Sequence, residues 1–82
     1  MQHDDIEATL ARILAENAKV DRAKVTPDKR LRDDLGVDSL ALIDVAVATE
    51  DAFGVAIPDE DLEHLQTVGD VAAYVRRARV EA

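Results

Sequence analysis

The sequence predicts an all-α protein, a small four-helix bundle with three main helices, one short helix and a long loop between the first two. In several segments apolar residues recur three and four positions apart, as they do along the buried face of a helix. Prolines and glycines separate these segments, at Pro27, Gly36, Gly54 and Pro58. With 82 residues and no cysteine, the chain can build one hydrophobic core and has no disulfide to support it. We therefore expect a single domain over residues 1–82.

The first helix is expected to begin with Asp4 and Asp5, whose carboxylates suit the positively polarised start of a helix. It should end near Lys19. Its apolar side chains follow the spacing of one helix face and are Ile6, Leu10, Ile13 and Leu14.

The segment from residue 20 to residue 38 has no helical periodicity and is longer than most connections in compact domains. Its apolar residues Val25, Leu31 and Leu35 are spaced as anchors to a core, and Thr26-Pro27 favours a turn. We expect this loop to be ordered.

The second helix is expected to begin at Asp38 or Ser39 and to end near Phe53, where Gly54 can take the left-handed conformation that closes helices. One stripe of this helix suits the core and comprises Leu42, Ala46, Thr49 and Phe53. A second stripe mixes apolar and acidic side chains and comprises Leu40, Ile43, Asp44, Val47, Glu50 and Asp51. A helix buried on several sides would also be apolar nearly all round, but the interleaved acids favour an exposed interaction surface.

The chain before Pro58 is expected to be extended, because the residue that precedes a proline is disfavoured in helical geometry. A short third helix from about Asp59 to Leu65 should follow, with Leu62 and Leu65 facing inward.

A last helix is expected to open at Thr67. Thr67 and Asp70 have the spacing of a capping box, with Asp in place of the commoner Glu. The inner face of this helix should consist of Val68, Val71, Ala72 and Val75.

The charge of the chain is strongly acidic and unevenly distributed. The formal net charge is −8, and the segment from Asp33 to Tyr74 contains acidic residues but no Lys or Arg. This excess of acid argues against nucleic acid and anionic membranes as partners and favours proteins with basic docking patches. A surface that only maintains solubility is the alternative. The N-terminus is acidic where a signal peptide is basic, and no apolar run approaches the length of a membrane span. We expect a cytoplasmic monomer without membrane insertion.

Ser39 is the most informative residue, because it follows Asp38 where a glycine-containing loop, Leu35-Gly36-Val37, gives way to a helix. A hydroxyl at this position would face solvent. The unpaired N–H groups and partial positive charge of a helix start would stabilise a phosphate attached to it. The sequence therefore predicts a modification site. The simplest alternative is that Ser39 only caps the helix, a role that Asp38 could also fill.

Two other kinds of chemistry are disfavoured. A nucleophilic serine needs a general base, and neither His3 nor His64 has a compelling relation to Ser39. A calcium loop that began at Asp59 would need glycine at its sixth position, where the chain has His64. We expect neither a catalytic site nor a metal site. A non-catalytic acidic helical module that binds other proteins without a prosthetic group remains the alternative function.

From about Val25 to Tyr74 the chain resembles the acyl carrier proteins. The resemblance rests on the run Leu35-Gly36-Val37-Asp38-Ser39-Leu40 together with Leu31, Asp34, Asp44, Glu50, Asp51, Phe53, Gly54, Ile57, Pro58, Asp59, Glu60, Thr67 and Val68. It implies that a phosphopantetheinyl transferase attaches phosphopantetheine to Ser39, with Asp38 as an adjacent, supporting residue. The thiol of this arm would carry acyl groups as thioesters between enzymes of fatty acid, polyketide or related lipid or siderophore biosynthesis.

The resemblance also implies two further sites on a carrier of the discrete bacterial type. A partner-recognition surface would comprise Leu40, Ile43, Asp44, Val47, Glu50 and Asp51. It would meet the transferase and acyl-activating, acyl-transferring and condensing enzymes that have basic docking patches. An acyl pocket would be lined by Ile43, Val47, Ile57, Leu62 and Val68. Ala41 and Ala52 stand where bacterial fatty-acid carriers often have acids, which indicates a specialised pathway.

Overall fold

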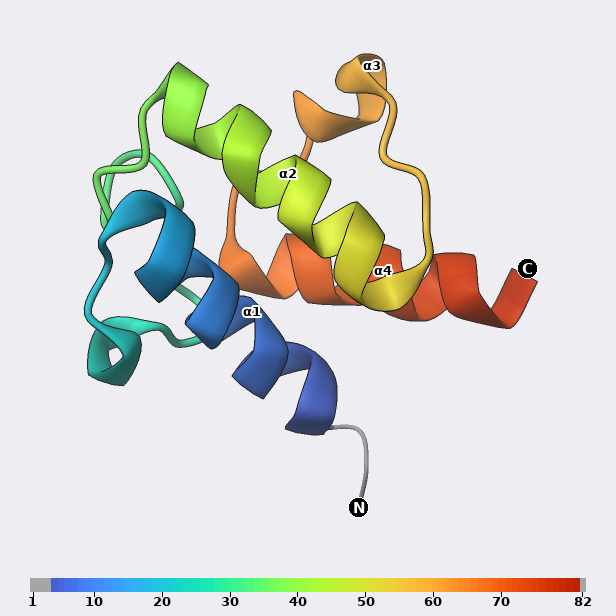
Figure 1. Ribbon diagram of the computed structural model, residues 1–82, viewed down its shortest axis with the longest axis horizontal. Helices are drawn as coiled ribbons and strands as arrows, with labels where there is room; N and C mark the ends of the chain where they lie inside the picture. The colour runs from blue at the N-terminus through green and yellow to red at the C-terminus, as the bar shows by residue number, and fades with distance from the viewer. Residues whose placement is uncertain (1–3, 82) are drawn as a thin grey trace.

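The computed structural model describes residues 4–81, with the side chains of residues 6–79. Within this range there is no strand, and the elements are α1 (Asp4–Ala18), the 3₁₀ turn η1 (Arg22–Lys24), α2 (Ser39–Phe53), α3 (Asp59–Leu62) and α4 (Val68–Glu81) (Figure 1). The predicted all-α class, with three main helices, one short helix and a long first loop, is confirmed. The turn η1 is an addition to the expected elements. None of the helices in the described range is long and apolar enough to cross a membrane.

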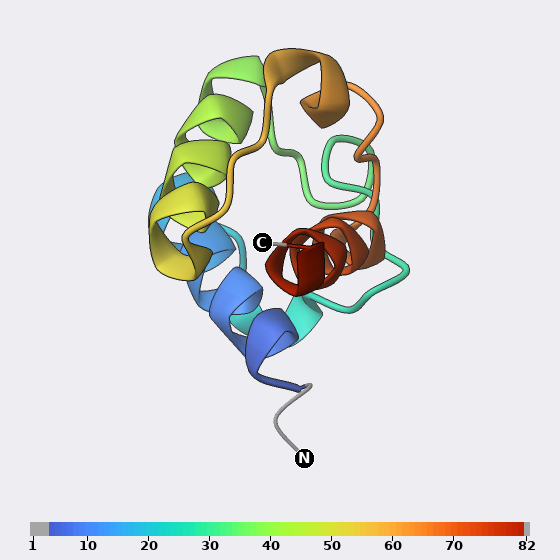
Figure 2. The same ribbon diagram turned by 90° about the vertical axis from the view of Figure 1, so that its right-hand side faces the viewer.

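The core is enclosed by α1, α2 and α4, and α3 lies on the other side of α2 from α1 (Figures 1 and 2). Both the predicted stripe of α1 and the predicted inner face of α4 are buried. In α2, Leu42, Ala46 and Thr49 are buried as predicted, whereas Phe53 is only partly buried and Val45 is an unpredicted member of the core. Burying one such aliphatic side chain contributes about 1.5–3 kcal/mol, so this cluster is the main source of stability.

The end of α1 falls at Ala18, one residue before the expected position. Lys19 takes a left-handed conformation with φ of 58°, and the N–H of Val20 donates to the carbonyl of Leu14 at 3.3 Å. The left-handed residue ends the helix, and this bond, which spans six positions, directs the next apolar residue back onto α1. Val20 is accordingly buried. The side-chain roles expected of residues 4 and 5 lie outside the described residues.

The long loop is ordered, as expected. Leu31 is buried, and Val25 and Leu35 pack partly buried against the core. The N–H of Lys29 donates to the carbonyl of Thr26 at 3.1 Å, which forms the predicted turn. Backbone hydrogen bonds join the loop to the start of α4. The N–H of Gly69 donates to the carbonyl of Pro27 at 2.8 Å, and the N–H of Val68 donates to the carbonyl of Lys29 at 3.0 Å. In the other direction, the N–H of Leu31 donates to the carbonyl of Gln66 at 2.8 Å.

The third helix is shorter than predicted and ends at Leu62. Its N-cap, Pro58, makes no side-chain hydrogen bond to the helix, and an isolated turn gains little from cooperativity. The chain continues to Leu65 in tighter turns, with the N–H of His64 bonded to Asp61 at 3.0 Å and that of Leu65 to Leu62 at 3.1 Å. Leu62 and Leu65 still pack partly buried against the core, as predicted.

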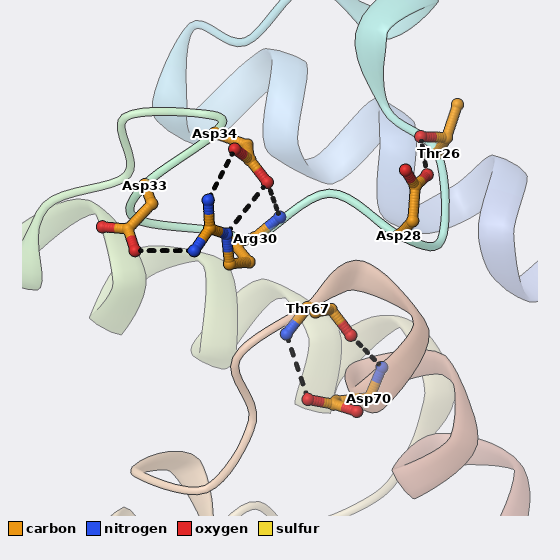
Figure 3. Close-up of polar contacts among 7 residues, drawn as sticks. All are labelled: Thr26, Asp28, Arg30, Asp33, Asp34, Thr67 and Asp70. Carbon is orange, nitrogen blue, oxygen red and sulfur yellow. Dashed lines mark hydrogen bonds and ion pairs between the residues drawn. The ribbon is translucent and has the colours of Figure 1, made fainter.

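The capping box at the start of α4 is confirmed (Figure 3). The N–H of Asp70 donates to Thr67 Oγ1 at 3.0 Å, and the N–H of Thr67 donates to Asp70 Oδ2 at 3.1 Å. Farther along α4, the Tyr74 hydroxyl lies 2.8 Å from an Asp61 carboxylate oxygen and 3.1 Å from the carbonyl oxygen of Ala56. These contacts tie α3 and the link before it to α4.

Candidate functional site

Ser39 is the first residue of α2, and its side chain is exposed. The residue before it, Asp38, has extended backbone geometry, and its Oδ1 accepts the N–H of Ala41 at 2.8 Å. Asp38 is therefore the N-cap, so the alternative in which Ser39 serves only as the cap loses its basis. Among the described residues, nothing accepts a hydrogen bond from the N–H groups of Ser39 and Leu40. These donors and the start of the helix dipole favour a negative charge near the Ser39 hydroxyl.

The two residues before Asp38 direct Ser39 outward. Gly36 turns the chain with φ of 70°, a conformation that suits glycine. Val37 is buried in the core, and its N–H donates to the carbonyl of Leu31 at 2.9 Å. Because Val37 is anchored in the core directly before the N-cap, α2 begins at the surface and its first residue is exposed.

Arg32 reaches back from the loop to the serine. Its Nη2 donates to Ser39 Oγ at 3.3 Å. The separation of acidic from basic residues along the chain therefore does not hold in space, because a guanidinium group lies against the hydroxyl. The sequence offered no periodicity from which this contact across seven positions could be read.

Arg30, two positions earlier, pairs with acids of the same loop (Figure 3). Its guanidinium lies 3.3 Å from Asp34 Oδ2 and 3.4 Å from Asp33 Oδ2, and its backbone N–H donates to Asp34 at 2.8 Å. Hydrogen bonds from Arg30 lower the pKa of Asp34, and the same carboxylate raises the pKa of Arg30. Nearby, a hydrogen bond from Thr26 lowers the pKa of Asp28.

The outer face of α2 is apolar and exposed. Leu40, Ile43 and Val47 are 77%, 54% and 52% exposed. Asp44 and Asp51 are exposed as well. Burial of α2 on several sides is therefore wrong, and five of the six predicted recognition residues lie open to solvent.

Glu50, the sixth predicted recognition residue, is partly buried and has a structural contact. Its Oε2 accepts the N–H of Ile57 at 2.7 Å, which fixes the extended link after α2. Since the two residues are seven positions apart across a helix end, no local pattern in the sequence signals this bond. A substitution at Glu50 would therefore disturb the fold as well as the surface charge.

A cavity of about 430 Å³ opens between the loop, α2 and α3, lined by Arg30, Leu31, Arg32, Asp33, Leu42, Leu62, Glu63, Leu65 and Gln66. Of the residues predicted to line an acyl pocket, only Leu62 is part of its wall. Ile57 and Val68 are buried elsewhere, and Ile43 and Val47 lie on the exposed face of α2. The structure thus does not bring the five predicted lining residues together around this space.

The described residues offer no second chemistry at Ser39. Its only side-chain partner among them is Arg32, a hydrogen-bond donor with no acceptor atom to take a proton from the hydroxyl. Within residues 4–81, the acidic and histidine side chains that are described do not gather into a group able to hold a metal ion.

Comparisons with known proteins show which family the chain is similar to. The family model described as "Phosphopantetheine attachment site" matches residues 8–75. The meromycolate extension acyl carrier protein of Mycolicibacterium smegmatis is 49% identical over 78 residues, which cover 95% of this chain and 79% of that protein. The acyl carrier protein of Rhodococcus erythropolis is 45% identical, over 95% of this chain and 86% of its own length. That of Acidothermus cellulolyticus is 43% identical over the whole chain and 98% of its own length.

The fold and the family match define a phosphopantetheine-binding carrier domain. The chain belongs to the acyl carrier protein family. It is therefore a carrier rather than a catalyst, and its prosthetic group is phosphopantetheine. Proteins of this family interact with biosynthetic enzymes and with a phosphopantetheinyl transferase. The residues present fit this group, because an exposed hydroxyl lies beside two unpartnered N–H donors and a guanidinium.

The cap geometry separates the structural role of Asp38 from that of Ser39. We expect Asp38→Ala to lower the free energy of unfolding by about 1 kcal/mol, because it removes the acceptor for the Ala41 N–H. Ser39→Ala should change it by far less, since the hydroxyl is exposed and only Arg32 contacts it. Urea denaturation of the two variants checks this, and an equal loss in both would mean that Ser39 shares in capping α2.

Proposed function

We propose that Ser39 carries the phosphopantetheine arm and that residues 1–82 act as one carrier domain. The observation that carries this proposal is the exposed Ser39 hydroxyl at a helix start that Asp38 already caps. Because the cap leaves the serine without a structural duty, its oxygen is available to form the phosphodiester bond. The transferase would transfer the arm from coenzyme A: the Ser39 oxygen would bond to the phosphorus next to pantetheine as the pyrophosphate bond breaks, the serine proton would leave, and adenosine 3′,5′-bisphosphate would be released.

This assignment is tested by intact mass. After coexpression with a phosphopantetheinyl transferase, the wild-type chain should gain one phosphopantetheine, and Ser39→Ala should gain none while keeping its helical circular dichroism. Ser39→Thr is a useful second variant, because it keeps a hydroxyl but crowds it with a methyl group and should be modified more slowly. If Ser39→Ala still gained the arm, or if the wild type gained none, the result would favour the alternative function, an acidic helical interaction module without a prosthetic group.

The proposed partner surface is the outer face of α2, formed by Leu40, Ile43, Asp44, Val47, Glu50 and Asp51. An exposed apolar stripe beside carboxylates suits a partner that presents a shallow apolar pocket with a basic rim. The partners we propose are the transferase and acyl-activating, acyl-transferring and condensing enzymes with such basic patches. The absence of cysteine agrees with a reducing cytoplasmic setting, and we expect the carrier to work as a monomer.

Charge reversal on this face tests the electrostatic part of the proposal. Asp44→Lys and Asp51→Lys should each slow loading by the transferase, mainly through a slower association rate. Added salt should slow the wild type, because charges are screened beyond about 10 Å near 0.1 M. Glu50→Lys is a poorer probe, since it also breaks the bond to Ile57.

Glu7→Lys is the matched control, because it makes the same charge change on α1. Loading rates at a series of salt concentrations provide the measurement. If Asp44→Lys and Asp51→Lys load as fast as Glu7→Lys, and salt has no effect, the acids serve solubility alone.

For the cargo, we propose an acyl chain of lipid biosynthesis, sheltered by the cavity between the loop, α2 and α3. The lipid class is supported by the name of the Mycolicibacterium smegmatis relative, a meromycolate extension acyl carrier protein. Shelter is supported by the four leucines in the cavity wall, Leu31, Leu42, Leu62 and Leu65, which stand beside charged and polar side chains at its edge. The predicted lining residues Ile57 and Val68 are buried, and a longer chain would reach them by parting the helices. Ile43 and Val47, which are exposed, would join such a pocket only if α2 turned.

A sheltered acyl chain should raise the melting temperature above that of the form with phosphopantetheine alone, since each buried methylene contributes about 0.8 kcal/mol. The gain should grow with chain length. Leu62→Phe should reduce it by filling the cavity, whereas Val47→Phe, on the exposed face of α2, is the matched control. A medium-length acyl group that leaves the melting temperature unchanged would show that the cargo stays in solvent, and a loss confined to Val47→Phe would restore the pocket predicted from the sequence.

A further inference from the structure

The guanidinium of Arg32 lies at the proposed attachment point and has no ion pair among the described residues. We propose that Arg32 binds the phosphate of the phosphopantetheine arm and so positions the base of the arm; this rests on the proposed function of Ser39. The contact from Arg32 Nη2 to Ser39 Oγ, 3.3 Å, puts the positive charge next to the atom that would bear the phosphate. A neutral hydroxyl is a weak partner for a guanidinium, whereas a phosphodiester is a strong one.

The neighbouring arginine explains why Arg32 is free for this role. The guanidinium of Arg30 pairs with two neighbouring acids of the loop, Asp33 and Asp34. Arg32 has no ion pair within the described residues, and Ser39 is its only polar contact there. The two arginines of this loop therefore have different roles: Arg30 stabilises the loop, and Arg32 faces the site.

The charges around Ser39 explain why a cation is needed beside the arm. Asp38 directly precedes the serine, so a phosphodiester on Ser39 would add a negative charge beside a carboxylate. The N–H groups of Ser39 and Leu40 favour that charge at the helix start. Arg32 supplies the full positive charge that the segment from Asp33 to Tyr74 lacks.

Arg32 also belongs to the wall of the cavity. The same side chain therefore contacts Ser39 and borders the space between the loop, α2 and α3. A guanidinium–phosphate pair would hold the base of the arm at the edge of this cavity, which restricts the directions in which the rest of the arm can extend. Arg32 would thus restrict the motion of the arm as well as balance its charge.

Phosphorus NMR of the loaded protein tests this inference, because the arm contains the only phosphorus atom. The variants are Arg32→Gln, Arg32→Lys, and Arg76→Gln as a matched loss of charge at an exposed position on α4. In wild type and Arg76→Gln, the phosphorus relaxation should report restricted motion. Arg32→Gln should shift the signal and lose that restriction, and Arg32→Lys should recover part of it. Unchanged amide spectra would show that the fold is intact.

A phosphorus signal with the same shift and relaxation in wild type and Arg32→Gln would overturn the proposal. If Arg32→Gln is not loaded, the wild type decides: its Arg32 guanidinium nitrogen signals should shift between the unloaded and loaded forms, and unshifted signals would overturn it. Failure of the Ser39 assignment is recognised separately, since the wild type would then gain no arm and show no phosphorus signal.

Discussion

The attachment of the long loop to the start of α4 is the constraint on which the site depends. The N–H of Gly69 donates to Pro27 and that of Leu31 to Gln66, each at 2.8 Å. The approach is close: a Cβ on Gly69 would lie 3.0 Å from the Pro27 carbonyl oxygen, so glycine allows the contact. A loop of this length would otherwise lose much conformational entropy on ordering. Because it is fixed, it holds Val37 in the core and so sets where α2, and Ser39, begin.

Neighbouring side chains around Ser39 have different roles. Asp38 satisfies the helix start, which leaves Ser39 exposed and chemically available. Arg30 pairs with Asp33 and Asp34, whereas Arg32 faces the hydroxyl. The rest of α2 then presents exposed apolar side chains between carboxylates. With the arm on Ser39, as we propose, this arrangement would leave the outer face of α2 accessible to successive enzymes.

Local patterns in the sequence predicted the parts of the structure that local physics determines. The stripe of α1, the capping box of Thr67 and Asp70, the closure of α2 at Gly54 and the exposed face of α2 all follow from spacing or from the conformational preference of one residue. Contacts made across a loop or a helix end could not be predicted in this way. Examples are Arg32 with Ser39 and Glu50 with Ile57, each seven positions apart. The acyl pocket residues were inferred from resemblance, and only Leu62 meets the cavity, because its shape depends on where the loop packs.

The central claim is that Ser39 bears phosphopantetheine in the working protein. The most direct test uses the chain purified from its native host, digested and analysed by tandem mass spectrometry. We expect the peptide containing Ser39 to carry the arm through its hydroxyl and to release a pantetheine fragment on collision. A Ser39 peptide found only in its unmodified form, or an arm located on another residue, would contradict the claim.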